Sequence, residues 1–525
     1  MIIMTAICII TFLIYFAAKL KTGFHMLQQE SYFNSHYLEW AVKNLEKNVS
    51  VCDLMPVIVF LCALALTKSS FVSAIIYAVI NVFCIWFCIS RKPAAKKPLV
   101  VTPRVKRLIA TASVLVLADV AIMIIICKEN IYPLLAVFAF LNLLSFLYVA
   151  LVNIINRPME LYINHWFVND AKKKISGMPN LKVIGITGSY GKTSSKFILT
   201  SILSEKYHTL CTPESYNTTM GVVRTIREKL TPAYEIFVCE MGAKYVNDIK
   251  EICDIVHPHF GIITSIGPQH LETFGGIDNI IKTKLELADA VENKENLVLN
   301  GGSQLIAENA VGGAVYYSCD KTDKSVFWAE DVSYGPDGAK FTLCGKDISP
   351  VKLETKLLGK HNIENIVGAA AMAIKLGVSE KDIAFAIKKL KPVEHRLEMK
   401  KNGNLTIIDD AFNSNTAGAK SALEVLSSFP DGRMLITPGM VELGDKEYEY
   451  NFEFGRQAAE SCDYIILVGE KQTLPIKKGL EDKKFDANKL YVAKDLNDAL
   501  AKMREITAGG KWTVLLENDL PDLYL

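Results

Sequence analysis

Long apolar runs occupy most of the first 155 residues, and shorter alternating segments fill the rest of the chain. A helix needs about 20 predominantly apolar residues to cross a bilayer. Five runs have this character, of which the second is short: residues 2–18, 54–67, 71–90, 108–127 and 131–155. The pattern therefore predicts a membrane region over residues 1–157 with about five transmembrane helices.

Basic residues are distributed unevenly over the loops between these runs. Four lysines lie between the first and second runs and seven Lys or Arg residues between the third and fourth, whereas the other two loops contain only Lys68 and Lys128. Because loops rich in Lys and Arg stay in the cytoplasm, we predict an external N-terminus and a cytosolic location for everything after Arg157. Asp119 lies within the fourth run, where an interhelical hydrogen bond and a functional role are both open.

From residue 181 onward, short β-rich runs alternate with segments of helical period. This alternation is typical of a parallel sheet covered by helices. The sequence therefore predicts an α/β fold for this part, preceded by a linker over residues 158–180.

Composition agrees with this division into two parts. Half of the residues are hydrophobic and 22% are charged, which excludes a disordered chain. Residues 1–155 contain 13 basic and 6 acidic residues, and the rest of the chain contains 45 basic and 50 acidic ones. No concentrated basic face with interleaved aromatic residues occurs in the second part, so nucleic acid is not an expected partner. The 12 cysteines are scattered without zinc-type pairs, as in a reducing cytosol.

The first predicted strand leads directly into a glycine-rich loop and then a helix. Backbone N–H groups and a helix N-terminus in this arrangement bind phosphate. Lys192 would place positive charge at the β- and γ-phosphates, and the Thr193 hydroxyl would bind Mg²⁺. Ile186 replaces the first glycine of the strict motif, and a purely structural turn is the alternative. The predicted nucleotide contacts are Thr187, Gly188, Ser189, Tyr190, Gly191, Lys192, Thr193 and Ser194.

This loop, TGSYGKT, resembles the TG(T/S)xGKT loop of the Mur ligase family, the ATP-dependent amide-forming enzymes of bacterial wall-precursor synthesis. Further motifs follow in the family's order through residues 181–525. The resemblance implies a central P-loop parallel-sheet ATPase domain over residues 181–393. It also implies a C-terminal Rossmann-like α/β domain over residues 394–525.

The resemblance also implies roles for residues in the central domain. Asn217 and Thr218 in TPESYNTTMG would contact the acceptor, Glu240 in VCEMGA would hold a first Mg²⁺, and His270 in IGPQHLETFGG would serve a second. The family has a lysine that reacts with CO₂ to form a carbamate, an anion able to help hold the second Mg²⁺. We assign it to Lys284 rather than Lys282, because a carboxylate, Glu286, follows two positions later as in the family.

Motifs nearer the C-terminus indicate the branch of the family. The segment GKHNIEN resembles the adenine-side motif and implies base contacts from Asn362 and Asn365. Arg396, near the join to the C-terminal domain, is a further expected nucleotide contact. The segment from residue 407, IIDDAFNSNTAGAKSAL, resembles the signature of the D-alanyl-D-alanine-adding branch. The residues expected at the site from it are Asp409, Asp410, Asn413 and Asn415, of which Asp410 would contact the nucleotide and the two asparagines the substrate.

Three departures from the family pattern limit what the resemblance implies. Phe412 replaces the signature tyrosine, and LLENDLPD replaces a Lys-Gly-Ser-Arg run near the C-terminus, which leaves the amine substrate open. The membrane region stands where the family has a nucleotide-sugar-binding domain, which leaves the form of the acceptor open.

The implied enzyme is an ATP-dependent amide ligase that acts through an acyl phosphate, with Lys192, Glu240, His270 and Lys284 as its catalytic residues. Its partners would be a wall-precursor-like carboxylate acceptor, an amino acid or dipeptide amine, two Mg²⁺ ions and the lipid bilayer. We expect it in the bacterial cell membrane, with the catalytic domains in the cytoplasm. The alternatives are the same catalyst acting on a lipid-linked or non-peptidoglycan acceptor, and a non-catalytic ATP-binding membrane scaffold.

Overall fold

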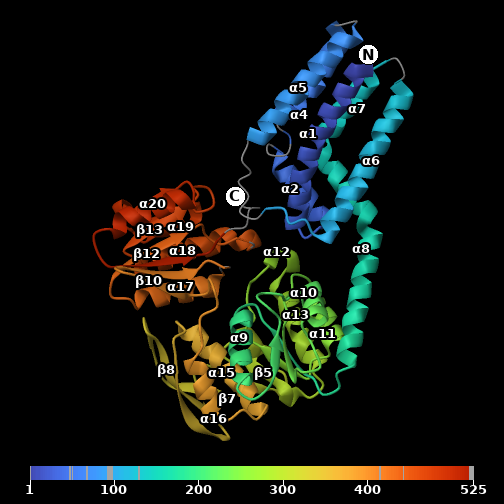
Figure 1. The fold of residues 1–525 in the computed structure, drawn as a ribbon. Coiled ribbons are helices and arrows are strands. Elements are labelled where there is room, and N and C mark those ends of the chain that lie inside the picture. Colours follow the sequence, from blue (N-terminus) through green and yellow to red (C-terminus); the bar gives the residue numbers. More distant parts are fainter. Residues whose placement is uncertain are drawn as a thin grey trace. The chain divides into compact units, whose positions relative to one another are not determined.

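The computed structural model of the chain describes residues 2–45, 49, 51–66, 69–90, 98–127, 130–412, 415–441 and 443–519. The chain divides into two compact units, which Figure 1 shows in blue to cyan and in green to red. The first, here called the helical unit, comprises Met1–Trp166 together with the last five residues. The second, here called the α/β unit, comprises Phe167–Leu520.

The helical unit is built from apolar helices whose aromatic side chains pack against one another. Phe12 stacks on Phe138 with ring centroids 3.9 Å apart, and both are fully buried. Outward-facing positions of the same helices are also apolar, for example Ile10 and Leu117, which are 56% and 61% exposed. The helices are α1 (Ile2–Gln29), α2 (Asn34–Lys43), α4 (Val51–Leu66), α5 (Ser70–Ser90), α6 (Pro103–Cys127), α7 (Tyr132–Leu143) and α8 (Ser145–Ser176).

Three helices in the described part of the chain, α1, α5 and α6, are long and apolar enough to cross a membrane. The fifth apolar run does not form one straight helix, because the chain breaks at Leu144 and α7 and α8 meet at a bend of 79°. Counting this bent pair as one span gives up to four spans. The helix on the second run, α4, belongs to the shorter apolar helices. The number of five spans therefore stays a prediction.

The expected linker is helical over most of its length, since residues 158–176 continue α8. After it, the α/β unit begins with a nine-stranded sheet in the order β2-β3-β1-β4-β5-β6-β7-β8-β9. Strands β1 to β7 pair in parallel, and β7, β8 and β9 pair antiparallel. The strands are β1 (Lys182–Thr187), β2 (Thr209–Cys211), β3 (Ile236–Glu240), β4 (Phe260–Ile263), β5 (Leu297–Asn300), β6 (Val315–Tyr317), β7 (Ser325–Gly335), β8 (Gly338–Gly345) and β9 (Ile348–Thr355).

Helices cover both faces of this sheet. Alternate residues of β1 enter different cores, as expected when both faces of a parallel sheet are buried: Ile184 packs on one side and Val183 on the other. The helices are α9 (Lys192–Leu203), α10 (Thr219–Glu228), α11 (Asp248–Val256), α12 (Leu271–Phe274), α13 (Ile277–Ala290), α14 (Gln304–Glu308), α15 (Lys360–Lys375) and α16 (Glu380–Lys388).

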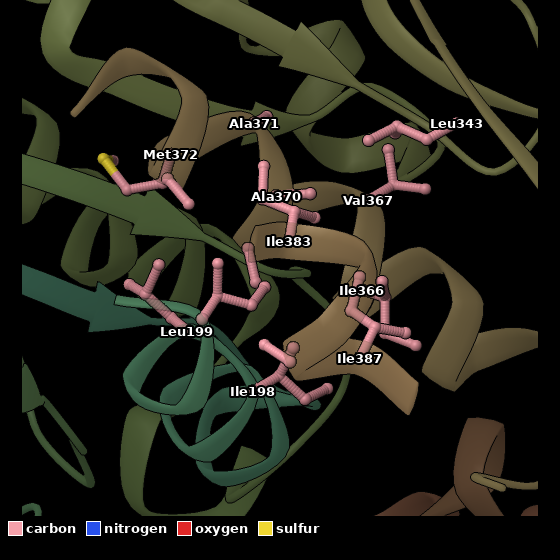
Figure 2. Close-up of a cluster of buried hydrophobic side chains, with 14 of the residues drawn as sticks. Ile198, Leu199, Leu343, Ile366, Val367, Ala370, Ala371, Met372, Ile383 and Ile387 are labelled. Atoms are coloured by element: carbon pink, nitrogen blue, oxygen red, sulfur yellow. The ribbon is translucent and has the colours of Figure 1, made fainter. Parts of the chain in front are cut away.

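The core that supports the glycine-rich loop lies between α9, α15 and α16 (Figure 2). Ile198 and Leu199 of α9 lie there with Ala370 of α15 and Ile387 of α16, and all are at most 3% exposed. Because alanines such as Ala370 are small, α15 packs closely on α9. This packing holds the start of α9 rigidly below the loop that precedes it.

A second sheet of six strands follows, in the order β10-β11-β15-β12-β13-β14. All of its neighbouring strands are parallel except β10 and β11. Its elements are β10 (Glu398–Asn402), β11 (Leu405–Asp410), α17 (Thr416–Ser427), β12 (Gly432–Thr437), α18 (Glu447–Ser461), β13 (Tyr464–Val468), α19 (Leu474–Asp482), β14 (Leu490–Ala493), α20 (Leu496–Thr507) and β15 (Trp512–Glu517). The predicted α/β class with parallel sheets and a helical N-terminal region is confirmed.

Candidate functional site

The glycine-rich loop connects β1 to α9 and is clamped by the segment that follows β4. Ser189 donates its N–H to the Ser265 carbonyl at 2.7 Å and its hydroxyl to the Gly267 carbonyl at 2.9 Å. Gly188 has a φ of 152°, and a Cβ atom there would lie 2.1 Å from the Thr264 hydroxyl oxygen. Glycine is therefore required where the loop turns against this segment.

Lys192 is the first residue of α9, and its ammonium group turns back over the loop. Its Nζ donates to the carbonyls of Gly188 at 2.7 Å and Ser189 at 3.0 Å. Burial, together with the nearby Arg396 cation, lowers the pKa of Lys192 to about 8 despite the attraction of Glu240. A buried cation beside backbone N–H groups at a helix N-terminus is suited to an anionic ligand.

Glu240, at the end of β3, lies at the centre of a buried polar cluster. The Thr193 hydroxyl donates to its Oε1 at 2.9 Å, and the Asn217 amide donates to the same oxygen at 3.0 Å. The Lys196 ammonium lies 3.0 Å from the other oxygen, Oε2. Burial alone would raise the pKa of Glu240, but Lys196, Asn217 and Lys192 together hold it below its usual value. Glu240 is therefore a carboxylate anion.

The two lysines considered for the carbamate differ sharply in their surroundings. Lys284 on α13 is 2% exposed, whereas Lys282 is exposed. Burial and the Lys192 cation lower the pKa of Lys284 well below its usual value, although Asp248 and Glu286 oppose the shift. A neutral amine is the form that attacks CO₂, and the lowered pKa of Lys284 favours this form. Glu286 does not pair with it in a hydrogen bond but accepts the backbone N–H groups of Asn247 and Lys250, each at 2.8 Å.

His270 lies on the segment that clamps the loop. It is the N-cap residue that precedes the short helix α12, has a left-handed backbone with φ 54°, and is partly buried. Two residues earlier, the Pro268 carbonyl accepts the Tyr190 hydroxyl at 2.9 Å. The structure thus places the His270 segment beside the glycine-rich loop.

A cavity of about 320 Å³ adjoins the loop and is lined by both parts of the α/β unit. From the nine-stranded part come Tyr190, Gly191, Ser194, Asn362 and Asn365, and from the six-stranded part come Arg396, Asp410, Asn415 and Glu517. Seven of these nine residues, including Arg396 and Asp410, were predicted to contact the nucleotide. Asn415 was predicted to contact the substrate. The cavity therefore gathers predicted residues that lie more than 200 positions apart.

The two asparagines of GKHNIEN are oriented by their neighbours. Asn365 accepts the Ser195 hydroxyl at 3.1 Å, and Asn362 donates to the Leu358 carbonyl at 2.8 Å. Gly191 needs its missing side chain here, since a Cβ atom would lie 2.6 Å from the Asn365 side-chain oxygen. The loop, α9 and α15 therefore meet tightly at one edge of the cavity.

The six-stranded part contributes charge to the cavity. Burial lowers the pKa of Arg396 against the attraction of Glu240 and Asp410, and its guanidinium lies 4.5 Å from the ring centroid of Phe412, the residue that replaces the signature tyrosine. Burial raises the pKa of Asp410 to about 6 despite the hydrogen bond from the Leu397 N–H. Glu517 faces Asp410 on the neighbouring strand β15.

Three of the expected site residues have structural roles, and a fourth lies outside the described residues. Asn415 caps α17 by accepting the Gly418 N–H at 2.8 Å, and Thr218 caps α10 by accepting the Gly221 N–H at 3.3 Å. Asp409 pairs with His395 at 2.8 Å and with Lys400. Asn413 falls outside the residues that the structure describes.

Three residues at the site were not predicted from the sequence: Lys196, His361 and Glu517. Lys196 carried a usable signal, because it lies three positions before the buried Leu199 on the apolar stripe of α9. His361 hydrogen-bonds Ser421 of α17 at 2.7 Å, and burial with the Arg396 charge lowers its pKa to about 4. Only the pairing of β11 with β15 brings Glu517 to the cavity, so no local pattern reveals it.

Sequence comparison accounts for both parts of the α/β unit. The family described as the Mur ligase middle domain matches residues 186–373, and the one described as the Mur ligase, glutamate ligase domain matches residues 395–516. The two matches together span more than half of the chain. The chain belongs to the Mur ligase family.

Individual relatives point to one branch of the Mur ligases. The UDP-N-acetylmuramoyl-tripeptide–D-alanyl-D-alanine ligase of Escherichia coli (strain K12) is 27% identical over 330 residues, which cover 61% of this chain and 73% of the relative. The same enzyme of Bacillus subtilis (strain 168) is 28% identical over 338 residues, covering 63% and 71%. The crystal structure of MurF from Acinetobacter baumannii superposes with a TM-score of 0.62 and 26% identity, covering 68% of this chain and 77% of that one.

These findings confirm the predicted resemblance. The chain is a MurF-like Mur ligase, and as such it is an ATP-using enzyme. Both family matches lie in the α/β unit, which starts at Phe167 and contains every candidate residue described above.

Proposed function

We propose that this Mur ligase joins a wall-precursor-like carboxylate to the amine of an amino acid or dipeptide in the cytoplasm, at the membrane. The single observation that carries the proposal is the convergence of Lys192 and Arg396 on one buried carboxylate, Glu240, beside the glycine-rich loop, with the buried Lys284 close to Lys192. Relatives that join a nucleotide-sugar tripeptide to D-alanyl-D-alanine support the same reaction class.

A carboxylate needs activation before it forms an amide, because its oxygen is a poor leaving group. In the proposed reaction the acceptor carboxylate attacks the γ-phosphate of ATP, which releases ADP and leaves an acyl phosphate. The amine nitrogen then attacks the acyl carbon, and inorganic phosphate departs. Lys192 would offset charge on the transferred phosphoryl group, and Arg396 would do so from the opposite part of the cavity.

The residues around Glu240 fit a divalent cation. The Thr193 hydroxyl oxygen and Glu240 Oε1 lie 2.9 Å apart and are hard oxygen donors of the kind that Mg²⁺ prefers. A bound Mg²⁺ would neutralise phosphate charge and orient the nucleotide. A second ion needs another anion, which the Lys284 carbamate would supply with His270 as a further ligand. The burial of Lys284, which favours its neutral amine, supports this assignment.

We propose that the nucleotide occupies the cavity of about 320 Å³, with its base toward Asn362 and Asn365. Arg396 and Asp410 would then contact it from the six-stranded part. Water would be excluded when the two parts close on the substrate, which protects an acyl phosphate from hydrolysis.

The form of the acceptor has a second candidate, because one end of the helical unit is basic. Arg107 makes a bidentate ion pair with Glu160, at 2.6 and 2.7 Å, while the Arg104 guanidinium stacks 3.8 Å from the centre of the Tyr32 ring. Arg157 is exposed nearby in sequence to Glu160. Basic residues at a membrane surface attract anionic head groups by about 1 kcal/mol each. Because Arg107 is already paired with Glu160, the exposed Arg157 and the basic residues of the loop that precedes Arg107 are the charges that would favour an acceptor carried on a lipid phosphate.

Product analysis tests the proposed reaction directly. Purified full-length protein is incubated with ATP, candidate wall precursors and a panel of amines, and products are identified by mass. The expected product is the acceptor extended by one amine through an amide bond, with one ADP released per bond. ATP consumption without any amide product would contradict the proposal. Comparing kcat/KM for a soluble precursor and for the same peptide on its lipid carrier then decides between the two acceptor forms.

Accessibility tags test the membrane placement. The loop charges predict that tags at the N-terminus and at residue 69 are reached from outside intact cells, while tags near residue 98 and at the C-terminus are protected. Labelling near residue 98 from outside would refute this orientation and with it the cytoplasmic location of the ligase site.

A further inference from the structure

Lys196 is the most deeply buried cation of the site and has no role in the reaction described above. It lies one helical turn after Lys192 on α9, and both its side chain and that of Glu240 are 0% exposed. Burying an ammonium group away from water is unfavourable unless other groups compensate it. The groups that contact the Lys196 ammonium therefore indicate its role.

The first partner of Lys196 is one particular oxygen of Glu240. The Lys196 ammonium lies 3.0 Å from Oε2, whereas the Thr193 hydroxyl and the Asn217 amide both bind Oε1. Because the two oxygens are occupied from different sides, the carboxylate cannot rotate without breaking one set of contacts. Lys196 thereby keeps Glu240 Oε1 directed at the Thr193 hydroxyl. These two oxygens are the atoms expected to bind a cation.

The second partner of Lys196 is the backbone of the loop over residues 212–218, here called the acceptor loop. The Lys196 ammonium donates to the carbonyl of Glu214, whose backbone is left-handed with φ 44°. Glu214 itself is exposed, so its carbonyl is held by a group that reaches it from the core. The same ammonium thus contacts the middle of the acceptor loop and the carboxylate at the end of β3.

The ends of the acceptor loop are fastened to the same strand end. The Thr212 hydroxyl accepts the Glu240 N–H at 3.1 Å, and the Asn217 carbonyl accepts the Gly242 N–H at 2.7 Å. A movement of the Glu240 carboxylate would act on the Asn217 amide near one end of the loop and, through Lys196, on the Glu214 carbonyl at its centre. Lys196 therefore links the centre of the acceptor loop to the Glu240 carboxylate, which lies next to the glycine-rich loop.

We propose that Lys196 is a positioning residue that couples nucleotide binding to the conformation of the acceptor loop. When a nucleotide and its cation engage Glu240, Lys196 transmits the change to the Glu214 carbonyl and so prepares the loop for the acceptor. The acceptor's use of this loop rests on the proposed function. The coupling itself is a property of these contacts and needs no knowledge of the acceptor.

Hydrogen–deuterium exchange of the full-length protein in detergent tests the coupling. The probe is ADP with Mg²⁺, and the readout is amide exchange in peptides that cover residues 210–221. Wild-type protein is expected to show slower exchange in these peptides when the probe binds. Lys196→Met is expected to lose this response while it still binds ADP, measured by calorimetry. Lys206→Met serves as the matched control, because Lys206 is exposed in the turn that follows α9 and should respond like wild type.

Three results would overturn the coupling. They are an unchanged exchange of the wild-type loop on binding the probe, an equal response in Lys196→Met, and an equal loss in Lys206→Met. If Lys196→Met does not fold, Lys196→Arg takes its place, since it keeps the charge but cannot keep both contacts in the same geometry, and a wild-type response in it counts against the proposal. Wild-type protein that binds no ADP at all would instead refute the proposed function.

Kinetics provide a second readout once an acceptor is known. Loss of one charge-assisted hydrogen bond at the loop should raise KM for the acceptor about tenfold in Lys196→Met, with a smaller change in KM for ATP. A residue that only supported the fold would lower the active fraction, and therefore kcat, without separating the two KM values. Equal KM values in the variant and wild type would contradict the positioning role.

Discussion

The helical unit and the α/β unit both bury charged side chains, but they compensate the charges differently. In the helical unit each buried acid meets its own partners on another helix: Asp53 accepts Tyr15 at 2.7 Å and pairs with Lys19 at 2.9 Å, and Glu160 pairs with Arg107. In the α/β unit the cations outnumber the acid they surround, since Lys192, Lys196 and Arg396 all act on Glu240.

This difference distinguishes charged groups that fix the packing of helices from charged groups that can bind a ligand. A paired charge is neutralised within the protein and fixes how two helices meet, whereas an excess of buried cations is compensated only when an anionic ligand binds. The surfaces differ in the same direction. Large apolar residues face outward along the helical unit, and the charged groups of the α/β unit converge inward on its cavity. The following experiments test whether this division of roles holds, from the largest expected effect to the smallest.

Removing the loop cation should have the largest effect. Lys192→Ala should lower ATP turnover about 10³-fold or more, because the lysine offsets charge on the transferred phosphoryl group. The variant should remain folded and membrane-bound, since its ammonium contacts only loop carbonyls. ADP release and circular dichroism are measured together. Undiminished ADP release would contradict the assignment of the glycine-rich loop to nucleotide binding.

The buried and exposed lysines of α13 form a matched pair. Lys284→Ala should lower activity about 10²-fold, the scale on which loss of a catalytic electrostatic group acts, and short carboxylic acids should restore part of it by replacing the carbamate. Lys282→Ala should leave turnover nearly unchanged, because this side chain is exposed. Full activity in Lys284→Ala, or a loss confined to Lys282→Ala, would show that the carbamate was assigned to the wrong residue.

His361 predicts a pH dependence of stability. In the folded protein the pKa of His361 is about 4, below its usual value of 6.5. Between these two pH values the unfolded chain is protonated at His361, whereas the folded chain is not. Stability from this group is therefore present above pH 6.5 and is lost as the pH falls toward 4, by about 2 kcal/mol between pH 7 and 5.

The His361→Gln variant is the control for that dependence. Denaturant unfolding of wild type and variant at pH 7 and 5 should show a smaller loss in the variant, because glutamine does not titrate. Identical losses in the two proteins would mean that His361 is not held neutral in the contact with Ser421.

An ion pair of the helical unit should give the smallest effect on catalysis. Glu160→Gln removes the anionic partner of Arg107 and should lower the stability of the helical unit in detergent by about 1–2 kcal/mol. Turnover of a soluble acceptor should stay within about twofold of wild type, since the pair lies in the other unit. Thermal aggregation and turnover are compared in the same preparations. A large loss of turnover with unchanged stability would contradict the division between packing and chemistry.

Features that depend on contiguous residues could be predicted from the sequence. The glycine-rich loop between a strand and a helix needs only residues 182–203, and the apolar runs are visible directly. The break at Leu144 could not be predicted, because the run stays apolar through the bend and hydropathy does not report direction. The same holds for Asn415 and Thr218, whose side chains serve either as caps or as ligands depending on the backbone around them.

The sequence by itself determined the family, the α/β class and the glycine-rich loop between a strand and a helix. The prediction of a carbamate at Lys284 rested on the position of Glu286. Only the tertiary structure decided which of these groups are buried and which residues surround them. Lys282 and Lys284 are two positions apart, so a helix directs them to different sides and buries only one. Lys196, Glu214 and Glu240 meet because β1, β3 and α9 pack together. Burial and long-range pairing depend on the whole fold, and no local pattern of residues contains them.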